Sequence, residues 1–408
     1  MAFLSSGQLL INIVLLKNKH HILGGANFVI MEFKNKINEL LIELEGKNPN
    51  NEKVLIGLDG FVDKIVHVVG KRKSVTEFDR IKTIKEFGER IVKAAGLSTN
   101  FEMVVLQEKL GGNGPILSNA FLTYGLGLTY IGALGYPQID NAFKHMNENG
   151  KVYSIASPGT TDALEFDDGK LMIGKLESLN DVNFENIKKI IGIPKLTELI
   201  NDSSLFGLEN WTMLPHMSSI WRGIIEEVLP HIDNSKGKRF IFFDLADPEK
   251  RTNEDIIEAL ALIQKFSKYF NVILGLNLKE AVEIAEVLEL NGYKCDDSDA
   301  TKLKELTEQI SSKIDIYCLV IHPTVEATAV VLGNYYHVDG PYTATPILTT
   351  GAGDNFNAGF CLGQVLKLNP EQSLILGVAT SGYYVRNAKS PSFDNLKEFL
   401  NNWREEKV

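Results

Sequence analysis

The clearest structural pattern in the chain is RFIFFDLADPEKRTNEDIIEALALIQKFSKYFNVILGLNLKEAVEIAEVLEL, residues 239–290. Two short apolar runs, RFIFFDLA and NVILGL, are each followed by a segment with apolar residues at helical spacing, 253–266 and 278–290. Near-continuous apolar runs are typical of strands that are buried on both faces, and the alternation of such strands with helices is typical of a parallel sheet. This pattern therefore predicts two strand–helix units of a parallel sheet that helices cover on both faces.

The same alternation continues on both sides of this region. Further strands are expected at VLIGLDGF (54–61), LTYIGAL (128–134) and IDIYCLVI (314–321). We therefore expect a three-layer α/β/α fold with a mostly parallel central sheet. Ligands of open α/β sheets bind at the carboxyl ends of the strands, so the functional residues should follow these runs.

One segment, TDALEFDDGKLMIGK (161–175), has a different pattern. Apolar and polar residues alternate on either side of Asp168-Gly169, a pair that favours a two-residue type I′ turn. We expect an antiparallel β flap that includes about residues 160–176 and is inserted in a domain of residues 31–408. Such a flap could act as a lid that excludes water from a site.

The composition excludes several classes of protein. With 408 residues, 44% of them hydrophobic, the chain can bury a large core, and its net charge of −10 argues against nucleic acids and anionic membranes as partners. No apolar run reaches the roughly 18 residues of a membrane-spanning helix. Cys295, Cys318 and Cys361 are widely spaced, which supports neither a disulfide framework nor a zinc site and predicts a cytoplasmic protein.

Residues 1–30 carry an apolar run without the basic flank or the cleavage site of a signal peptide. We interpret them as an extension that is dispensable, with Met31 as an alternative start. After Met31, the spacing of Ile37, Leu40, Leu41 and Leu44 predicts an amphipathic helix.

The segment TTGAGDNFNAGF (349–360) predicts a phosphate site. Its small residues precede an expected helix, so backbone N–H groups and the helix dipole could converge on one anion. An acid beside this anion hole would repel a phosphate, so it needs a function there. In phosphoryl transfer it could accept the proton of the attacking hydroxyl, and the helix N-terminus would keep it ionised. The alternative is that it only caps the helix. The anion hole comprises Thr350, Gly351, Ala352 and Gly353, and the acid is Asp354.

Two more segments join this one in a family resemblance. GLDGFVD (57–63), GGNGPILSNAFLTYGLGLTYIGALG (111–135) and TTGAGDNFNAGF, in this order, resemble the PfkB carbohydrate kinases, the ribokinase-like kinases. The resemblance covers about residues 52–400 and implies a ribokinase-like fold. It also implies transfer of the terminal phosphate of Mg-ATP to a hydroxyl of a sugar or related polyol, with Asp354 as the base.

The resemblance implies further site residues. In this family an acid after the first strand and a Gly-Gly pair bind the substrate hydroxyls, and an NxxE motif organises Mg²⁺ through water. The matching substrate residues here are Asp63, Gly111, Gly112 and Asn113, with Asp59 a weaker choice; the metal residues are Asn277 and Glu280. Each has a structural alternative, since Asn277 and Glu280 also form a helix capping box and the acids could bind turn backbone.

Departures from the family leave several points open. The usual Asn after the glycine pair falls on Ile116, so Asn113 or Asn119 would have to replace its contact. An Asp that helps to bind a monovalent cation is replaced by Leu348, which leaves potassium dependence open. An ADP-dependent sugar kinase, a nucleoside kinase and a non-catalytic binding protein on the same fold remain alternatives. Family analogy also suggests a homodimer through the flap strands.

Overall fold

A computed structural model describes residues 31–235, 237–290, 292–293 and 300–408. The chain divides into a large unit, residues 48–393, and a smaller one whose described part comprises residues 31–47 and 394–408. The prediction that residues 1–30 are dispensable concerns a segment outside the described residues.

The large unit is built on a nine-stranded sheet with the order β14-β13-β12-β11-β10-β9-β1-β5-β6. Its strands are β1 (Lys53–Leu58), β5 (Gly127–Gly132), β6 (Lys151–Ser154), β9 (Leu205–Leu208), β10 (Arg239–Asp244), β11 (Phe270–Leu276), β12 (Cys318–Ile321), β13 (Glu326–Val331) and β14 (Asn334–Asp339). All pairs from β6 to β12 are parallel, and β13 and β14 add an antiparallel edge. The predicted mostly parallel sheet is confirmed, although β12 begins later than the apolar run suggested.

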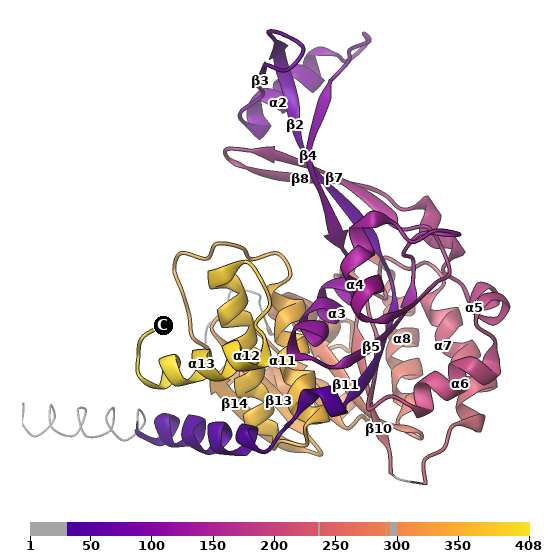
Figure 1. The fold of residues 1–408 in the computed structure, drawn as a ribbon, viewed down its shortest axis with the longest axis vertical. Coiled ribbons are helices and arrows are strands. Elements are labelled where there is room, and N and C mark those ends of the chain that lie inside the picture. The colour runs from indigo at the N-terminus through magenta and orange to yellow at the C-terminus, as the bar shows by residue number, and fades with distance from the viewer. Residues whose placement is uncertain (1–30, 236, 291, 294–299) are drawn as a thin grey trace, which may run out of the picture. The chain divides into compact units, whose positions relative to one another are not determined.

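Helices cover both faces of this sheet (Figure 1). One face carries α3 (Asn113–Tyr124), α11 (Ala352–Val365) and α12 (Pro370–Asn387), with α4 (Lys144–Asn149) against α3; the other carries α5 (Phe184–Ile190), α6 (Ile193–Asn201), α7 (Met217–Gly223), α8 (Asn253–Phe266), α9 (Leu278–Val287) and α10 (Ala300–Lys313). Successive side chains of β10 point to opposite faces of the sheet. Phe243 packs edge-on against Phe266 of α8 on one face, and Asp244 accepts a hydrogen bond from Asn357 of α11 on the other. The three-layer prediction is confirmed.

A second, five-stranded sheet forms the flap (Figure 1). It contains β2 (Phe61–Arg72), β3 (Phe78–Arg80), β4 (Met103–Gly111), β7 (Gly159–Phe166) and β8 (Gly169–Lys175), with α2 (Ile84–Lys93). The predicted hairpin is β7 and β8, which pair antiparallel. The flap is larger than predicted, because β2 pairs antiparallel with β3 and β4 and parallel with β7.

The predicted type I′ turn is wrong in register and in type. Phe166 pairs with Gly169, so the loop residues are Asp167 and Asp168, one position earlier than expected. A type I′ turn needs positive φ at both loop residues, and neither aspartate has it. The carboxylate of Asp168 accepts a hydrogen bond of 2.8 Å from the backbone N–H of Ile84, so contact with the start of α2 fixes this turn.

The smaller unit joins the two ends of the described chain. A helix over residues 31–45 lies beside α13 (Phe393–Arg404). The rings of Phe33 and Trp403 pack edge-on, with 4.8 Å between their centroids. Ile37, Leu40 and Leu44 are buried, as the helical spacing predicted. No helix in the described part of the chain is long and apolar enough to cross a membrane.

Candidate active site

The main sheet gathers acids at the carboxyl ends of its central strands. Asp59 and Glu209 directly follow β1 and β9, Asp244 ends β10, and each is at most 7% exposed. Asp354 and Glu280, in the first turns of α11 and α9, are buried beside them. Burial raises the pKa of Glu209 well above its ordinary value, and the charges of Asp244, Asp354 and Asp59 raise it further. The predicted edge of the sheet is therefore strongly acidic.

Asp354 has a raised pKa that the sequence did not predict. Burial raises the pKa of its carboxyl to about 8, and the negative charge of Asp59 adds to this effect. A hydrogen bond from the side chain of Asn113 acts in the opposite direction. This burial acts against the expectation that the helix N-terminus keeps Asp354 ionised, because desolvation disfavours the charged carboxylate.

The turn before α11 is held from two sides. Gly351 caps the helix with a φ of +87°, a conformation that favours glycine. The Tyr384 hydroxyl donates to the carbonyl of Thr350 at 2.8 Å, and the Ala352 N–H donates to the carbonyl of Thr349 at 3.0 Å. These hydrogen bonds hold the turn in place, and the Ala352 N–H is already used inside it.

Asp59 is bound entirely by protein groups. Its carboxylate accepts hydrogen bonds from the N–H groups of Asn113 and Gly114, both at 3.0 Å, and from the side chains of Asn210 at 2.8 Å and Tyr130 at 3.2 Å. It is fully buried, and this burial raises its pKa to about 6. These contacts fix the start of α3 to the end of β1, which favours the structural alternative for Asp59.

The glycine pair is explained by the acids beside it. A Cβ atom at Gly111 would lie 2.4 Å from a carboxylate oxygen of Asp63, and one at Gly112 would lie 2.6 Å from a carboxylate oxygen of Asp59. Gly112 also has a φ of +99°. The positive φ favours glycine at Gly112, and a side chain at Gly111 would displace the Asp63 carboxylate, so the pair and the two acids form one arrangement.

Asp63, Gly112 and Asn113 line a cavity of about 480 Å³ between the flap and the sheet edge. Its other lining residues are Phe61, Thr161, Met172, Gly174, Leu176, Asn210, Met213, Ala246, Asp247, Lys250 and Glu280. Burial raises the pKa of Asp63. Of the two asparagines considered as replacements at Ile116, only Asn113 lines this cavity.

Asn277 and Glu280 form the predicted capping box. The Asn277 side chain accepts from the N–H of Glu280 at 3.0 Å, and the Glu280 carboxylate accepts from the N–H of Asn277 at 2.9 Å. The other Glu280 oxygen accepts from the N–H of Asp247 at 3.1 Å, where Ala246 and Asp247 both have positive φ. The capping interpretation is confirmed, and Glu280 additionally holds a strained loop.

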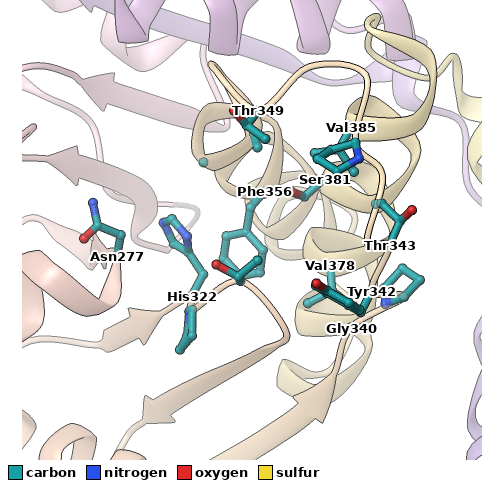
Figure 2. A pocket seen from close by; sticks show the side chains of 17 residues that line it. Asn277, His322, Gly340, Tyr342, Thr343, Thr349, Phe356, Val378, Ser381 and Val385 are labelled. Carbon is teal, nitrogen blue, oxygen red and sulfur yellow. The ribbon is translucent and has the colours of Figure 1, made fainter. Parts of the chain in front are cut away.

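A second cavity, of about 360 Å³, opens beside the glycine turn (Figure 2). Ala352 and Gly353 line it together with Asn277, His322 and Phe356. The imidazole of His322 stacks on the Phe356 ring with 4.6 Å between centroids, and burial lowers its pKa to about 4. The cavity is therefore lined by uncharged side chains.

Sequence reasoning missed Glu209, Asn210, Asp244 and His322. Glu209 and His322 each follow a short apolar strand directly, which is the position where such residues are expected to function. A single polar residue after a strand is too common to be selected without a motif, and these residues are identified by the structure alone.

The fold is ribokinase-like. The chain aligns over 86% of its length with 99% of the ribokinase from Thermotoga maritima, at a TM-score of 0.56 and 15% identity. It aligns over 86% of its length with 99% of the adenosine kinase from Sinorhizobium meliloti, at a TM-score of 0.58 and 16% identity. At these identities the likeness shows the fold.

The chain belongs to the prokaryotic ketohexokinase family, whose model matches residues 41–403. It is 29% identical over 353 residues to a ketohexokinase from Haloferax volcanii. This alignment covers 86% of this chain and 91% of the relative. The protein is therefore a carbohydrate kinase of the PfkB type, a phosphotransferase with an alcohol group as acceptor.

Proposed function

We propose that the protein transfers the terminal phosphate of Mg-ATP to a hydroxyl of a ketohexose or closely related sugar. The relative from Haloferax volcanii and the matching family model are both described as ketohexokinases, which supports a ketose as acceptor. ATP is the donor that its kinase family implies.

The position of Asp354 between the two cavities carries this proposal. Its neighbour Gly353 lines the smaller cavity, and Asn113, whose side chain binds Asp354, lines the larger one. A nucleotide in the smaller cavity and a sugar in the larger one would therefore meet at this carboxylate, which is the geometry that phosphoryl transfer needs.

Asp354 would act as the base. The sugar hydroxyl oxygen forms a bond to the terminal phosphorus, the bond from that phosphorus to the bridging oxygen breaks, and the hydroxyl proton passes to the Asp354 carboxylate. The turn formed by Thr350, Gly351, Ala352 and Gly353 would stabilise the transferring phosphate through those of its N–H groups that are not bonded within the turn, which excludes the N–H of Ala352.

The larger cavity would bind the sugar. Asp63 and Asn113 line this cavity with polar side chains, and Gly112 would let the backbone approach the sugar there. Gly111 would act indirectly, by leaving room for the Asp63 carboxylate. Asp59 would act by positioning α3. Met172 and Gly174 of the flap line the same cavity, so the flap would close over the sugar and exclude water.

Glu280 and Asn277 fit a Mg²⁺ that is held through water. Carboxylate and amide oxygens suit this hard cation, and each Glu280 oxygen that accepts one N–H group keeps a second lone pair for a metal-bound water. When bound, Mg²⁺ neutralises charge on the nucleotide phosphates.

A substrate screen tests this function. Purified protein is incubated with ATP or ADP as donor and with ketohexoses, aldoses, polyols or nucleosides as acceptor, and nucleotide product is measured. We expect the highest kcat/KM with ATP and a ketohexose. Turnover of nucleosides alone, or binding without turnover for every pair, would contradict the proposal.

A further inference from the structure

The antiparallel hairpin at the edge of the main sheet carries three side chains of metal-binding type on one face. Glu326 at the start of β13 pairs directly with Asp339 at the end of β14, and Thr328 pairs with His337. Residues two apart on a strand point to the same face of the sheet. Glu326, His337 and Asp339 therefore share one face of the hairpin, and the proposed phosphoryl transfer does not use them.

This face of the hairpin points toward α10. The Thr328 hydroxyl lies 2.9 Å from the hydroxyl of Thr307 in α10. The opposite face points toward α12, because a Cβ atom at Gly340 would lie 3.6 Å from Cβ of Val378. Val378 lines the smaller cavity, so the hairpin itself separates the three side chains from that cavity. In the strand order, β12 and β11 separate the hairpin from β10 and the acid at its end.

The three side chains bring their ligand atoms close together. Nε2 of His337 lies 2.7 Å from Oε2 of Glu326 and 3.9 Å from Oδ1 of Asp339. One ligand atom from each residue lies within 4.8 Å of the other two. Two ligands of a tetrahedral Zn²⁺ with bonds of about 2.0 Å are roughly 3.3 Å apart. Small side-chain shifts would therefore bring the three atoms to the separations that this ion needs.

The two acids lack a permanent positive partner. Like charges directly opposite each other on neighbouring strands are destabilising, and Glu326 and Asp339 form such a pair. Among the described residues, the ion pairs recorded for either acid are with His337, which is charged only when protonated. On the facing helix, the Lys304 ammonium lies 3.9 Å from Glu308. A divalent cation would compensate both carboxylates and accept the neutral imidazole as a ligand.

We propose that Glu326, His337 and Asp339 bind Zn²⁺ across the β13–β14 hairpin. One imidazole and two carboxylates form a donor set that suits this ion, and water would take the fourth position. The three side chains are 11%, 31% and 85% exposed, so the ion has a path from solvent to a partly buried site. Because β14 is the outermost strand of the sheet, the ion would also fix this strand to β13.

The ion would act on the wall of the smaller cavity. Gly340 follows Asp339 and donates a hydrogen bond to the carbonyl of Val325 at 2.7 Å. Together with Tyr342 and Thr343, Gly340 lines the cavity (Figure 2). The ion would thus hold the hairpin end from which this wall continues. We expect Zn²⁺ to strengthen nucleotide binding, a consequence that rests on the proposed place of the nucleotide in this cavity.

Binding of Zn²⁺ to the full chain without nucleotide tests the site. The protein is freed of metals with a chelator, and binding is measured by competition with a chromogenic zinc chelator. We expect saturable binding by the unchanged protein and at least ~10-fold weaker binding by Glu326→Gln and His337→Gln, since loss of even an outer-shell partner costs about this much. His145→Gln, which removes an exposed histidine of α4, is the matched control and should bind as the unchanged protein does.

A third variant separates loss of a ligand from loss of the fold. The Asp339 side chain is largely exposed, so Asp339→Asn should be at least as stable without metal and yet bind Zn²⁺ more weakly. Zn²⁺ should raise the Tm of the unchanged protein but not that of His337→Gln. The proposal is overturned if the unchanged protein binds no Zn²⁺. It is equally overturned if His337→Gln binds Zn²⁺ as tightly, which would leave His337 as a hydrogen-bond partner of Glu326.

The Kd for Mg-ATP, measured with and without Zn²⁺, tests the link to the cavity. We expect Zn²⁺ to lower this Kd a few-fold in the unchanged protein and to leave it unaltered in His337→Gln. Equal Kd values with and without Zn²⁺ in the unchanged protein would overturn the link. Failure of the protein to bind any nucleotide would contradict the proposed function, whereas the Zn²⁺ titration decides on the metal site by itself.

Discussion

Asp354 combines two properties that its sequence position alone does not reveal. Its neighbour Gly353 lines one cavity and its hydrogen-bond partner Asn113 lines the other, and burial raises its pKa to about 8. A carboxylate with a raised pKa is a better proton acceptor than an ordinary aspartate, so the environment suits the proposed base. The same burial makes the charged form costly when no cation is near.

Replacement of Asp354 by asparagine tests its role. Asp354→Asn keeps the size of the side chain but cannot take up the proton, so kcat should fall by roughly 10² to 10⁴, the effect of losing a general base. The Kd for nucleotide should hold or improve, because a negative charge beside the phosphates is removed. Near-normal kcat in the Asn variant would leave Asp354 as a helix cap.

The pH dependence of the rate gives an independent test. A base must be deprotonated, and kcat/KM reports the pKa values of the free enzyme. We expect kcat/KM to rise with pH and to level off above about 8, following the raised pKa of Asp354. A plateau that begins near pH 5 would show that Asp354 is ionised at neutral pH.

The free energy of unfolding should fall as pH rises, whereas kcat/KM should rise. The raised pKa of Asp354 means that the folded protein holds a proton that the unfolded chain releases between about pH 4 and 8. The stabilisation is complete at low pH and is lost as pH rises through 8. Without ligands, the Tm of the unchanged protein should fall relative to that of Asp354→Asn between pH 5.5 and 8.5. A constant difference would contradict the raised pKa.

At the scale of elements, the central strands were predictable and the flap was only partly so. Continuous apolar runs reveal β1, β5, β10 and β11, and α8 coincides with its predicted span. The turn between β7 and β8 was mispredicted because a contact distant in sequence, from Asp168 to Ile84, decides its conformation. Local pair preferences contain no information on such contacts.

The site residues were likewise predictable only where they belong to a local sequence motif. Gly351 to Asp354 form a local motif, and the capping box of Asn277 and Glu280 is visible from spacing alone. Glu209 and Asp244 become neighbours only because β9 and β10 pair in one register. The order of strands in the sheet creates this pair of acids, and the order was not predictable from the spacing of residues.

The turn of the flap offers a test of the lid. Asp168→Ala removes the acceptor of the Ile84 N–H group, so the β7–β8 hairpin should open more often while the main sheet is unaffected. We expect faster hydrogen exchange at residues 159–175, a KM for sugar raised a few-fold and little change in Tm. Asp162→Ala, which removes the ion pair with Lys175 on the same hairpin but leaves the turn contact intact, is the matched control. Equal effects of both variants would argue against the turn contact.

For the whole molecule, the described residues already contain each proposed functional group, and all of them follow residue 52. A chain that starts at Met31 should therefore fold and keep its activity. A chain that starts at residue 48 should be less stable, because it loses the helix that carries Phe33 and, with it, the ring contact to Trp403. Soluble yield, Tm and kcat of both truncations check this. Loss of active protein in the Met31 chain would show that residues 1–30 are needed.

With the nucleotide in the smaller cavity, as proposed, the uncharged walls of this cavity would decide which form of the nucleotide the enzyme can use. No Lys or Arg occurs among the described residues that line it, and buried acids lie next to it. Uncomplexed ATP, with its full negative charge, would meet repulsion without compensation, whereas the magnesium complex brings its own positive charge. Velocity at a fixed concentration of the complex should thus stay constant when uncomplexed ATP is added in excess, so that the enzyme responds to the complexed fraction of the nucleotide pool.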